Sequence, residues 1–237
     1  MATPKTIARC LPIVMLTVAA MAVSIIPAST VHAASALQTL VAAAERNTNT
    51  VRTLIHHDRF TFTGPGGSVN VSAHGTEDEV RNREQDYESV HVIQHAANGK
   101  TNKLSYTVDL IFLNGSTYYR TSSAPTLWKT QKGMTFPDPY TGGWQRGRTT
   151  VKIPITLAFA IVGTSGGQTH VHAPFSTKTT AGTVDLWITT GSKPYVVRQD
   201  IASHSTVKAK PGSQVTQVTF GPFNSNVDIQ PPAQASA

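Results

Sequence analysis

The sequence predicts an α+β domain built on a long, curved antiparallel sheet, with about two helices covering its concave apolar face. Short runs rich in Val, Thr, Phe and Tyr are separated by Gly, Pro and Asn, which is typical of antiparallel strands. Apolar and polar residues alternate within these runs, so one face is expected to be apolar and the other solvated. Only two segments show helical spacing, and two helices are too narrow for so wide a sheet. Curvature, loops or a ligand must cover the rest.

Residues 1–33 have the layout of a secretory signal peptide. Lys5 and Arg9 form a basic head, an apolar run covers residues 10–26, and small residues precede a cut after Ala33. The run is interrupted and shorter than the roughly 20 apolar residues of a membrane span. We expect cleavage near Ala33 and a secreted, extracytoplasmic protein of the cell envelope without a lipid anchor. A retained signal segment stays open as the alternative.

Cleavage leaves 204 of the 237 residues and removes the only cysteine, Cys10, so the stability of the mature chain must come from packing. The remaining length suits one domain, residues 34–230, followed by a tail, residues 231–237, that is predicted to be disordered. Without Lys5 and Arg9, 18 of the 20 basic residues face 13 acidic ones, and they are scattered. This pattern excludes a nucleic-acid surface and leaves a mild attraction to anionic membranes.

The first predicted helix covers residues 36–47, with Ser35 as a possible cap. Its apolar residues are spaced three and four apart and share one face: Leu37, Leu40, Val41 and Ala44. The second predicted helix covers residues 154–163, because Pro154 stands near its start and Gly163 at its end.

The predicted strands are clearest on either side of Asn114-Gly115, where "DLIFLNGSTYY" reads as a hairpin. Side-chain alternation sorts each strand into two faces, and it groups Val90 with Val92 and Phe60 with Phe62. The acidic run of residues 77–79, next to two arginines, is interpreted as the solvated end of a hairpin.

Several segments together resemble the LolA-like and LppX/LprG-like lipid carriers of bacterial cell envelopes. They are, in order, the signal peptide, the amphipathic helix, the meandering sheet, "NGSTYYRT" followed by "LWKT", the second apolar segment, "VDLWITTGSKPYVVRQD" and "FNSNVDIQPP". The resemblance covers most of residues 36–232, but the lipid-attachment cysteine of many relatives is missing. It implies an unclosed half-barrel whose concave side holds an acyl chain of a lipid or acylated protein.

We therefore expect a lipid-binding carrier or chaperone with an apolar cavity between sheet and helices. An ordinary closed core remains the alternative interpretation of the same side chains. The expected lining is Phe60, Phe62, Val90, Val92, Tyr106, Val108, Leu110, Phe112, Tyr118, Leu157, Phe159 and Ile161. The same architecture would also suit an envelope sensor that signals through a protein partner, and the sequence leaves the oligomeric state open.

Catalysis is not expected, and neither is a cofactor. "GTSGG", with Ser165, resembles the nucleophile elbow of serine hydrolases, but an elbow needs a strand before it and a helix after it. The order expected here is the reverse. His170 and His172 share a strand face, yet a metal site needs further ligands that the sequence does not identify. The segment "WQRGR", residues 144–148, is interpreted as a polar loop, with docking to an anionic headgroup as the alternative.

Overall fold

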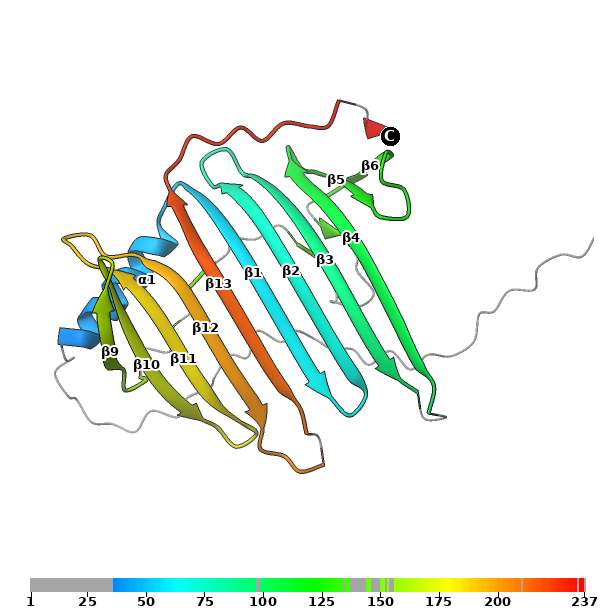
Figure 1. The fold of residues 1–237 in the computed structure, drawn as a ribbon. Helices are drawn as coiled ribbons and strands as arrows, with labels where there is room; N and C mark the ends of the chain where they lie inside the picture. The colour runs from blue at the N-terminus through cyan, green and yellow to red at the C-terminus, as the bar shows by residue number, and fades with distance from the viewer. Residues whose placement is uncertain are drawn as a thin grey trace, which may run out of the picture.

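The computed structural model shows one long sheet and one helix in the part of the chain that it describes (Figure 1). The described residues are 36–96, 99–133, 135–136, 144–145, 150–151, 153, 156–209, 211–233 and 235–236. The predicted signal peptide, Ser35, Pro154 and the arginines of "WQRGR" lie outside them. The elements are α1 (Ala36–Asn49), β1 (Thr53–Gly64), β2 (Gly67–Asp78), β3 (Arg83–His95), β4 (Thr101–Leu113), β5 (Ser116–Thr121), β6 (Trp128–Lys132), β7 (Thr135–Phe136), β8 (Trp144–Gln145), β9 (Ala160–Ser165), β10 (Gln168–Ser176), β11 (Thr180–Thr189), β12 (Val196–Ser205), β13 (Ser213–Phe223) and β14 (Ala235–Ser236).

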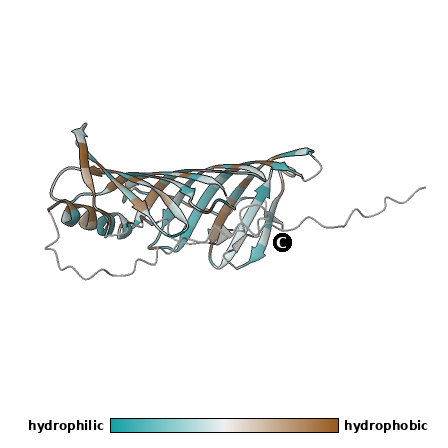
Figure 2. Ribbon diagram, turned by 90° about the horizontal axis from the view of Figure 1, so that it is seen from below, coloured by the Kyte–Doolittle hydropathy of each residue, from teal (hydrophilic) through white to brown (hydrophobic). Residues whose placement is uncertain are grey.

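The sheet has twelve strands in the order β14-β6-β5-β4-β3-β2-β1-β13-β12-β11-β10-β9, and β7 pairs with β8 separately. All pairings in the large sheet are antiparallel except that of β14 with β6. Two meanders, β1–β6 and β9–β13, join where β13 pairs with β1. The sheet curves and does not close, because β9 and β14 lie at its two edges (Figures 1 and 2). The predicted unclosed antiparallel sheet is confirmed, and the tail predicted to be disordered ends in β14.

The Asn114-Gly115 hairpin forms as the sequence predicts. Both residues have positive φ, 53° and 77°, as a two-residue turn of the right twist requires. The turn joins β4 to β5 and sets Leu113 opposite Ser116.

The helix α1 also forms as predicted and packs beneath one end of the sheet, against β11 and β12 (Figure 2). Val41 and Ala44 are buried, with Leu37 and Leu40 packed beside them. Thr48, also buried, ties the helix to the sheet: its hydroxyl donates to the Ala44 carbonyl and accepts from the backbone N–H of Val196 in β12. We call the sheet face toward α1 the inner face, and the opposite face the outer face.

The second predicted helix, residues 154–163, is wrong. Residues 160–165 form the edge strand β9 instead, so the described chain contains one helix rather than about two. Ile161 and Val162 are β-branched, which favours a strand. Ile161 pairs with Val171 of β10, and Val162 lies at an irregularity of the pairing between Ile161 and Gly163. The proline and glycine that suggested helix ends are equally compatible with a strand that follows a turn.

The main core lies between α1 and the inner face of β10–β13. It contains Leu54, Leu186 and Phe220, and Val151 and Ile153 join it from the segment before β9. A smaller cluster of Ile111, Leu113, Ile229, Tyr118 and Trp128 lies on the outer face. The expectation that only one face would be apolar is therefore wrong at this end, because Ile229, from the chain after β13, packs against Ile111 and Leu113.

Candidate ligand-binding face

The strand register arranges the inner face of β1–β4 in cross-strand rows. One row runs Phe60, Val71, Val90 and Tyr106, and the next runs Phe62, Val69, Val92 and Leu104. Each row takes one residue from each of four neighbouring strands, and all eight side chains are apolar or aromatic. We call these eight residues the apolar strip. Neighbouring strands are about 4.8 Å apart, so the strip is roughly 14 Å wide across the four strands.

The strip is buried at its centre and open at its flanks. Val90 and Val92 are 1% and 3% exposed, whereas Leu104 is 36% exposed and Phe60 and Phe62 are half-buried. On β13 both rows end in polar residues, Thr216 opposite Phe60 and Gln214 opposite Phe62. The strip is therefore a bounded apolar surface.

The structure brings most of the expected lining residues to the inner face, in separate groups. Five belong to the apolar strip: Phe60, Phe62, Val90, Val92 and Tyr106. Val108, Leu110 and Phe112 continue along β4 as a tightly buried cluster. Leu157 and Phe159 pack into the main core near α1.

Tyr118 and Ile161 do not join the other ten. Tyr118 lies on the outer face, where it packs with Ile111 and Leu113. Ile161 is 61% exposed on the edge strand β9. Val69, Val71 and Leu104 join the strip although the expected lining did not include them, and the alternation of their strands was the signal for them.

Beyond the apolar strip, the next rows carry a cluster of buried acids around His56. The rows run Asp58, Ala73, Glu88 and Val108; then His56, Gly75, Asp86 and Leu110; then Leu54, Glu77, Glu84 and Phe112. His56, Glu77, Glu84, Asp86 and Glu88 are all at most 5% exposed. The inner face is thus apolar at one end of β1–β4, whereas at the other end buried acids on β2 and β3 lie beside the apolar side chains of β4.

His56 is held by carboxylates on both sides of its ring. Its Nδ1 lies 2.9 Å from Asp58 Oδ2, and its Nε2 lies 3.5 Å from Asp86 Oδ1 and 3.6 Å from Glu77 Oε1. Burial lowers the pKa of His56, but the hydrogen bonds and charges of Asp58 and Asp86 outweigh burial and raise the pKa to about 10. His56 is therefore an imidazolium at neutral pH.

Gly75 makes the contact between His56 and Asp86 possible. It stands between them in the same row on β2, and a Cβ at this position would overlap both side chains. The missing side chain leaves room for the two to meet across an intervening strand.

The acidic run of residues 77–79 was misread as a solvated hairpin end. Glu77 is 0% and Asp78 4% exposed. Asp78 accepts a hydrogen bond from the backbone N–H of Arg81 and lies 3.5 Å from its Nη1, whereas Glu77 faces the interior beside His56. The even spacing of the acids at 84, 86 and 88, in phase with Val90 and Val92, was the signal for an acidic inner face.

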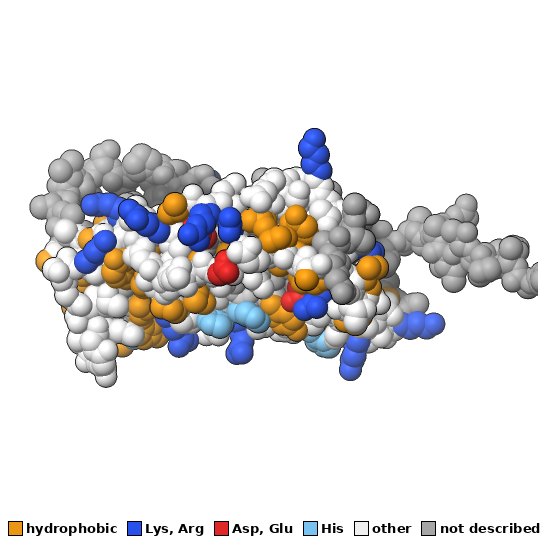
Figure 3. Space-filling view, turned by 90° about the horizontal axis from the view of Figure 1, so that it is seen from above, with side chains coloured by type: hydrophobic (Ala, Val, Ile, Leu, Met, Phe, Trp, Pro, Cys, Tyr) orange, Lys and Arg blue, Asp and Glu red, His pale blue; other side chains and the backbone are white. Residues whose placement is uncertain are grey.

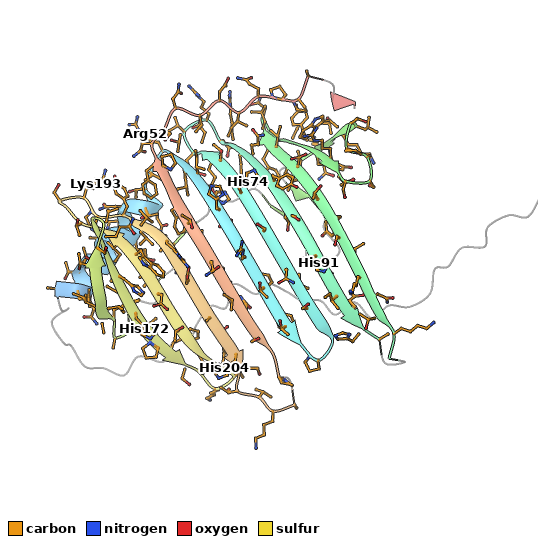
Figure 4. The ribbon with its side chains drawn as sticks, in the orientation of Figure 1. Arg52, His74, His91, His172, Lys193 and His204 are labelled. Atoms are coloured by element: carbon orange, nitrogen blue, oxygen red, sulfur yellow. The ribbon has the colours of Figure 1, made fainter. Side chains whose placement is uncertain are left out.

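The outer face carries most of the histidines. His74 and His91 lie on neighbouring strands (Figure 4), and His74 packs against Tyr87 at 5.1 Å between ring centroids. His170 and His172 share this face, as expected, and both contact Asp185 Oδ1, at 2.8 Å and 3.0 Å. Among the described residues, no group of three or more possible ligands is arranged to hold a metal ion.

Ser165 stands at the end of β9, and Gly166 and Gly167 then turn the chain directly into β10. The serine therefore has a strand on both sides. The helix that must follow a nucleophile elbow does not occur here.

Two open depressions lie away from the apolar strip. One, of about 680 Å³, is walled by Trp187, Tyr195, Phe220 and Phe223 near the ends of β11–β13. The other, of about 620 Å³, lies where α1 meets β1 and has basic residues in its wall. In the described ranges no helix is long and apolar enough to cross a membrane.

No protein-family model and no curated protein sequence matches the chain. Among solved structures, it is similar to the lipoprotein LppX of Mycobacterium tuberculosis, at 11% identity and a TM-score of 0.38, over 82% of this chain and 98% of that one. It is also similar to a DUF1329 family protein from Desulfovibrio piger, at 7% identity and a TM-score of 0.28, over 83% of this chain and 95% of that one.

Proposed function

We propose that the protein binds an acyl chain, carried by a lipid or an acylated protein, against the apolar strip of the inner face. The observation that carries this proposal is the strip itself: two adjacent rows of apolar side chains on β1–β4, with flanks open to solvent. In the described part of the chain, α1 is the only helix, and it packs on β11 and β12, beyond β13. The partly exposed side chains of the strip, such as Leu104 at 36%, leave apolar surface that a guest can cover.

The chemistry of the strip suits a hydrocarbon better than a polar ligand. It presents branched aliphatic groups and two phenylalanines, and Tyr106 supplies the one polar atom among the eight side chains. A guest that lies along the rows meets polar side chains at their β13 end, Thr216 and Gln214. The arrangement therefore favours an amphiphile with one long apolar part.

The free energy of such binding is sufficient for transport. Burial of one methylene contributes about 0.8 kcal/mol, so a chain of roughly 15 methylenes contributes about 12 kcal/mol before costs. Immobilising the ligand and ordering side chains subtracts several kcal/mol. The remainder is compatible with carriage through water and release to a better acceptor, and the predicted signal peptide would place this carrier in the cell envelope.

The test is binding of a fluorescent fatty acid to the wild type and to a strip variant. Leu104→Glu puts a charge on the exposed flank of the strip, so we expect the affinity to fall at least tenfold. Val215→Glu is the matched control, because Val215 is 40% exposed on the outer face of β13. It should change the affinity less than twofold.

Wild-type protein that takes up no fatty acid, or equal losses in the two variants, would refute the proposal. Leu110 and Phe112 are poorer test sites, because both are 0% exposed and a charge there would unfold the domain.

A further inference from the structure

The depression of about 620 Å³ lies at the end of the sheet that carries the β2–β3 and β11–β12 turns. Its wall comes from the last turn of α1, the start of β1, these two turns and the chain after β13. The end of α1 and the start of β1 form one continuous stretch, so four separate stretches of the chain meet in one pocket. We call it the basic pocket, for the charges described next.

Three cations and one carboxylate line the basic pocket. The cations are Arg52, Arg81 and Lys193, and the carboxylate is Asp78, so the lining carries a formal charge of +2. Asp78 is 4% exposed and already interacts with Arg81, through its backbone N–H and through Nη1. Its charge is therefore directed toward Arg81 rather than into the pocket.

The other two cations have no carboxylate partner among the described residues. Within the described ranges, the hydrogen bonds of Arg52 are made by its backbone, which donates to the Asn224 side chain and accepts from the N–H of Glu79. The Lys193 ammonium lies 5.7 Å from the ring centroid of Tyr195, which does not neutralise its charge. Figure 4 shows both side chains at the same end of the sheet. Two uncompensated charges at one pocket favour an anion.

Hydrogen bonds between segments far apart in the sequence hold the walls of the basic pocket together. Thr53 Oγ1 donates to the Ser225 carbonyl, Asn224 N–H donates to the Thr53 carbonyl, and Asn47 donates to the Pro194 carbonyl. These bonds hold the β11–β12 turn and the chain after β13 against β1 and α1. Arg52 and Lys193 therefore belong to segments that these hydrogen bonds hold in place.

An apolar residue stands at the rim beside the charges. Val80, in the β2–β3 turn, is 69% exposed and lines the same pocket. Figure 3, which views the molecule from this end, shows Lys and Arg side chains interspersed with hydrophobic ones. This mixture is typical of surfaces that meet lipid headgroups.

We propose that the basic pocket binds a phosphate group, carried by an anionic lipid headgroup or by free phosphate. Arg52 and Lys193 supply the charge, and Arg81, in the same lining, adds donors. This site is separate from the apolar strip: Thr53 and Phe60, the nearest strip residue on β1, are seven residues apart, or roughly 23 Å. Phosphate binding at the basic pocket can therefore be tested independently of acyl-chain binding at the apolar strip.

The experiment has two arms, one for each source of the phosphate. In the first, isotope-labelled protein is titrated with sodium phosphate at constant ionic strength, with chloride as the competing ion, and amide shifts are followed by NMR. In the second, protein is sedimented with vesicles of phosphatidylcholine alone or mixed with phosphatidylglycerol. Amides of residues 51–53, 80–81 and 224–227 should respond first.

The test variant is Arg52→Gln with Lys193→Gln, and the control is Lys178→Gln with Lys208→Gln. Both pairs remove two positive charges, but Lys178 and Lys208 lie in the exposed β10–β11 and β12–β13 turns at the opposite end of the sheet. We expect at least tenfold weaker binding in the test pair and less than twofold change in the control. If the test pair loses its folded NMR spectrum, Lys193→Gln alone is compared with Lys208→Gln.

Saturable phosphate shifts without vesicle binding identify free phosphate as the ligand, and vesicle binding that depends on the test pair identifies the headgroup. Wild-type protein that binds neither probe overturns the proposal. Equal behaviour of the test and control pairs overturns it as well, because the effect would then be one of overall charge.

Discussion

His56 is the residue whose surroundings determine the most about the inner face. It is 3% exposed, and Asp58, Glu77 and Asp86 lie within 3.6 Å of its ring nitrogens. Burial lowers the pKa of His56, but the hydrogen bonds and charges of Asp58 and Asp86 outweigh burial and raise the pKa to about 10, so a protonated ring is part of the folded state. Because the imidazolium offsets part of the negative charge around it, its loss exposes the carboxylates to mutual repulsion.

The raised pKa predicts how stability depends on pH. The folded pKa is about 10 and the unfolded pKa about 6.5, so the contribution of His56 is complete below pH 6.5 and is lost as pH rises to 10. A shift of this size corresponds to at most about 5 kcal/mol. We expect the urea-derived free energy of unfolding of the wild type to fall between pH 7 and pH 10.

The His56→Gln variant should be less stable at pH 7 and should lack that part of the decline. It is the appropriate control because other groups that titrate in this range are the same in both proteins. Parallel pH profiles for the two proteins would contradict the assignment of the proton to His56.

Residue-scale prediction from sequence succeeded where a pattern repeats and failed where one residue depends on its neighbours in space. Alternation grouped Phe60 with Phe62 and Val90 with Val92 within their strands, and the strand register puts both pairs on one face. The burial of Glu77 was not predictable in the same way, since carboxylates are usually exposed. Its burial depends on His56, which meets it only when β1 pairs with β2.

Among the elements, β9 shows how a helical pattern can be misleading. A short apolar run between Pro and Gly is compatible with a helix or a strand, and periodicity alone does not separate the two. The presence of β10 as a pairing partner decides the outcome, and the run becomes an edge strand with Ile161 and Val162 exposed. By contrast, Asn114-Gly115 specifies its turn locally, and that hairpin was predicted correctly.

The edge position of β9 predicts that it tolerates charge. Ile161→Lys should change the free energy of unfolding by less than about 0.5 kcal/mol, because the side chain is 61% exposed. Leu157→Ala, in the main core, should cost about 2–5 kcal/mol. Chemical denaturation of both variants gives the comparison. A large loss in Ile161→Lys would mean that this segment packs inward as the predicted helix would.

For the whole molecule, the sequence predicts a curved sheet but not the neighbours of each strand. The pairing of β13 with β1 joins the start of the domain to its end, and no short sequence motif predicts this pairing. Because of that pairing, the polar residues Thr216 and Gln214 of β13 border the apolar strip. The main core lies on the other side of this border, under β10–β13. The inner face is therefore divided into an acidic region, an apolar strip and a helix-covered core, rather than forming one uniform cavity.

The most direct measurement of the central claim locates a fatty acid on the sheet. Isotope-labelled protein is mixed with a fatty acid that carries a spin label, and the broadening of each amide signal is measured. Acyl-chain binding to the apolar strip predicts the strongest broadening for residues 60–71 and 90–106, and little for β10–β12. Broadening that is absent, uniform or concentrated on β10–β12 would contradict the account.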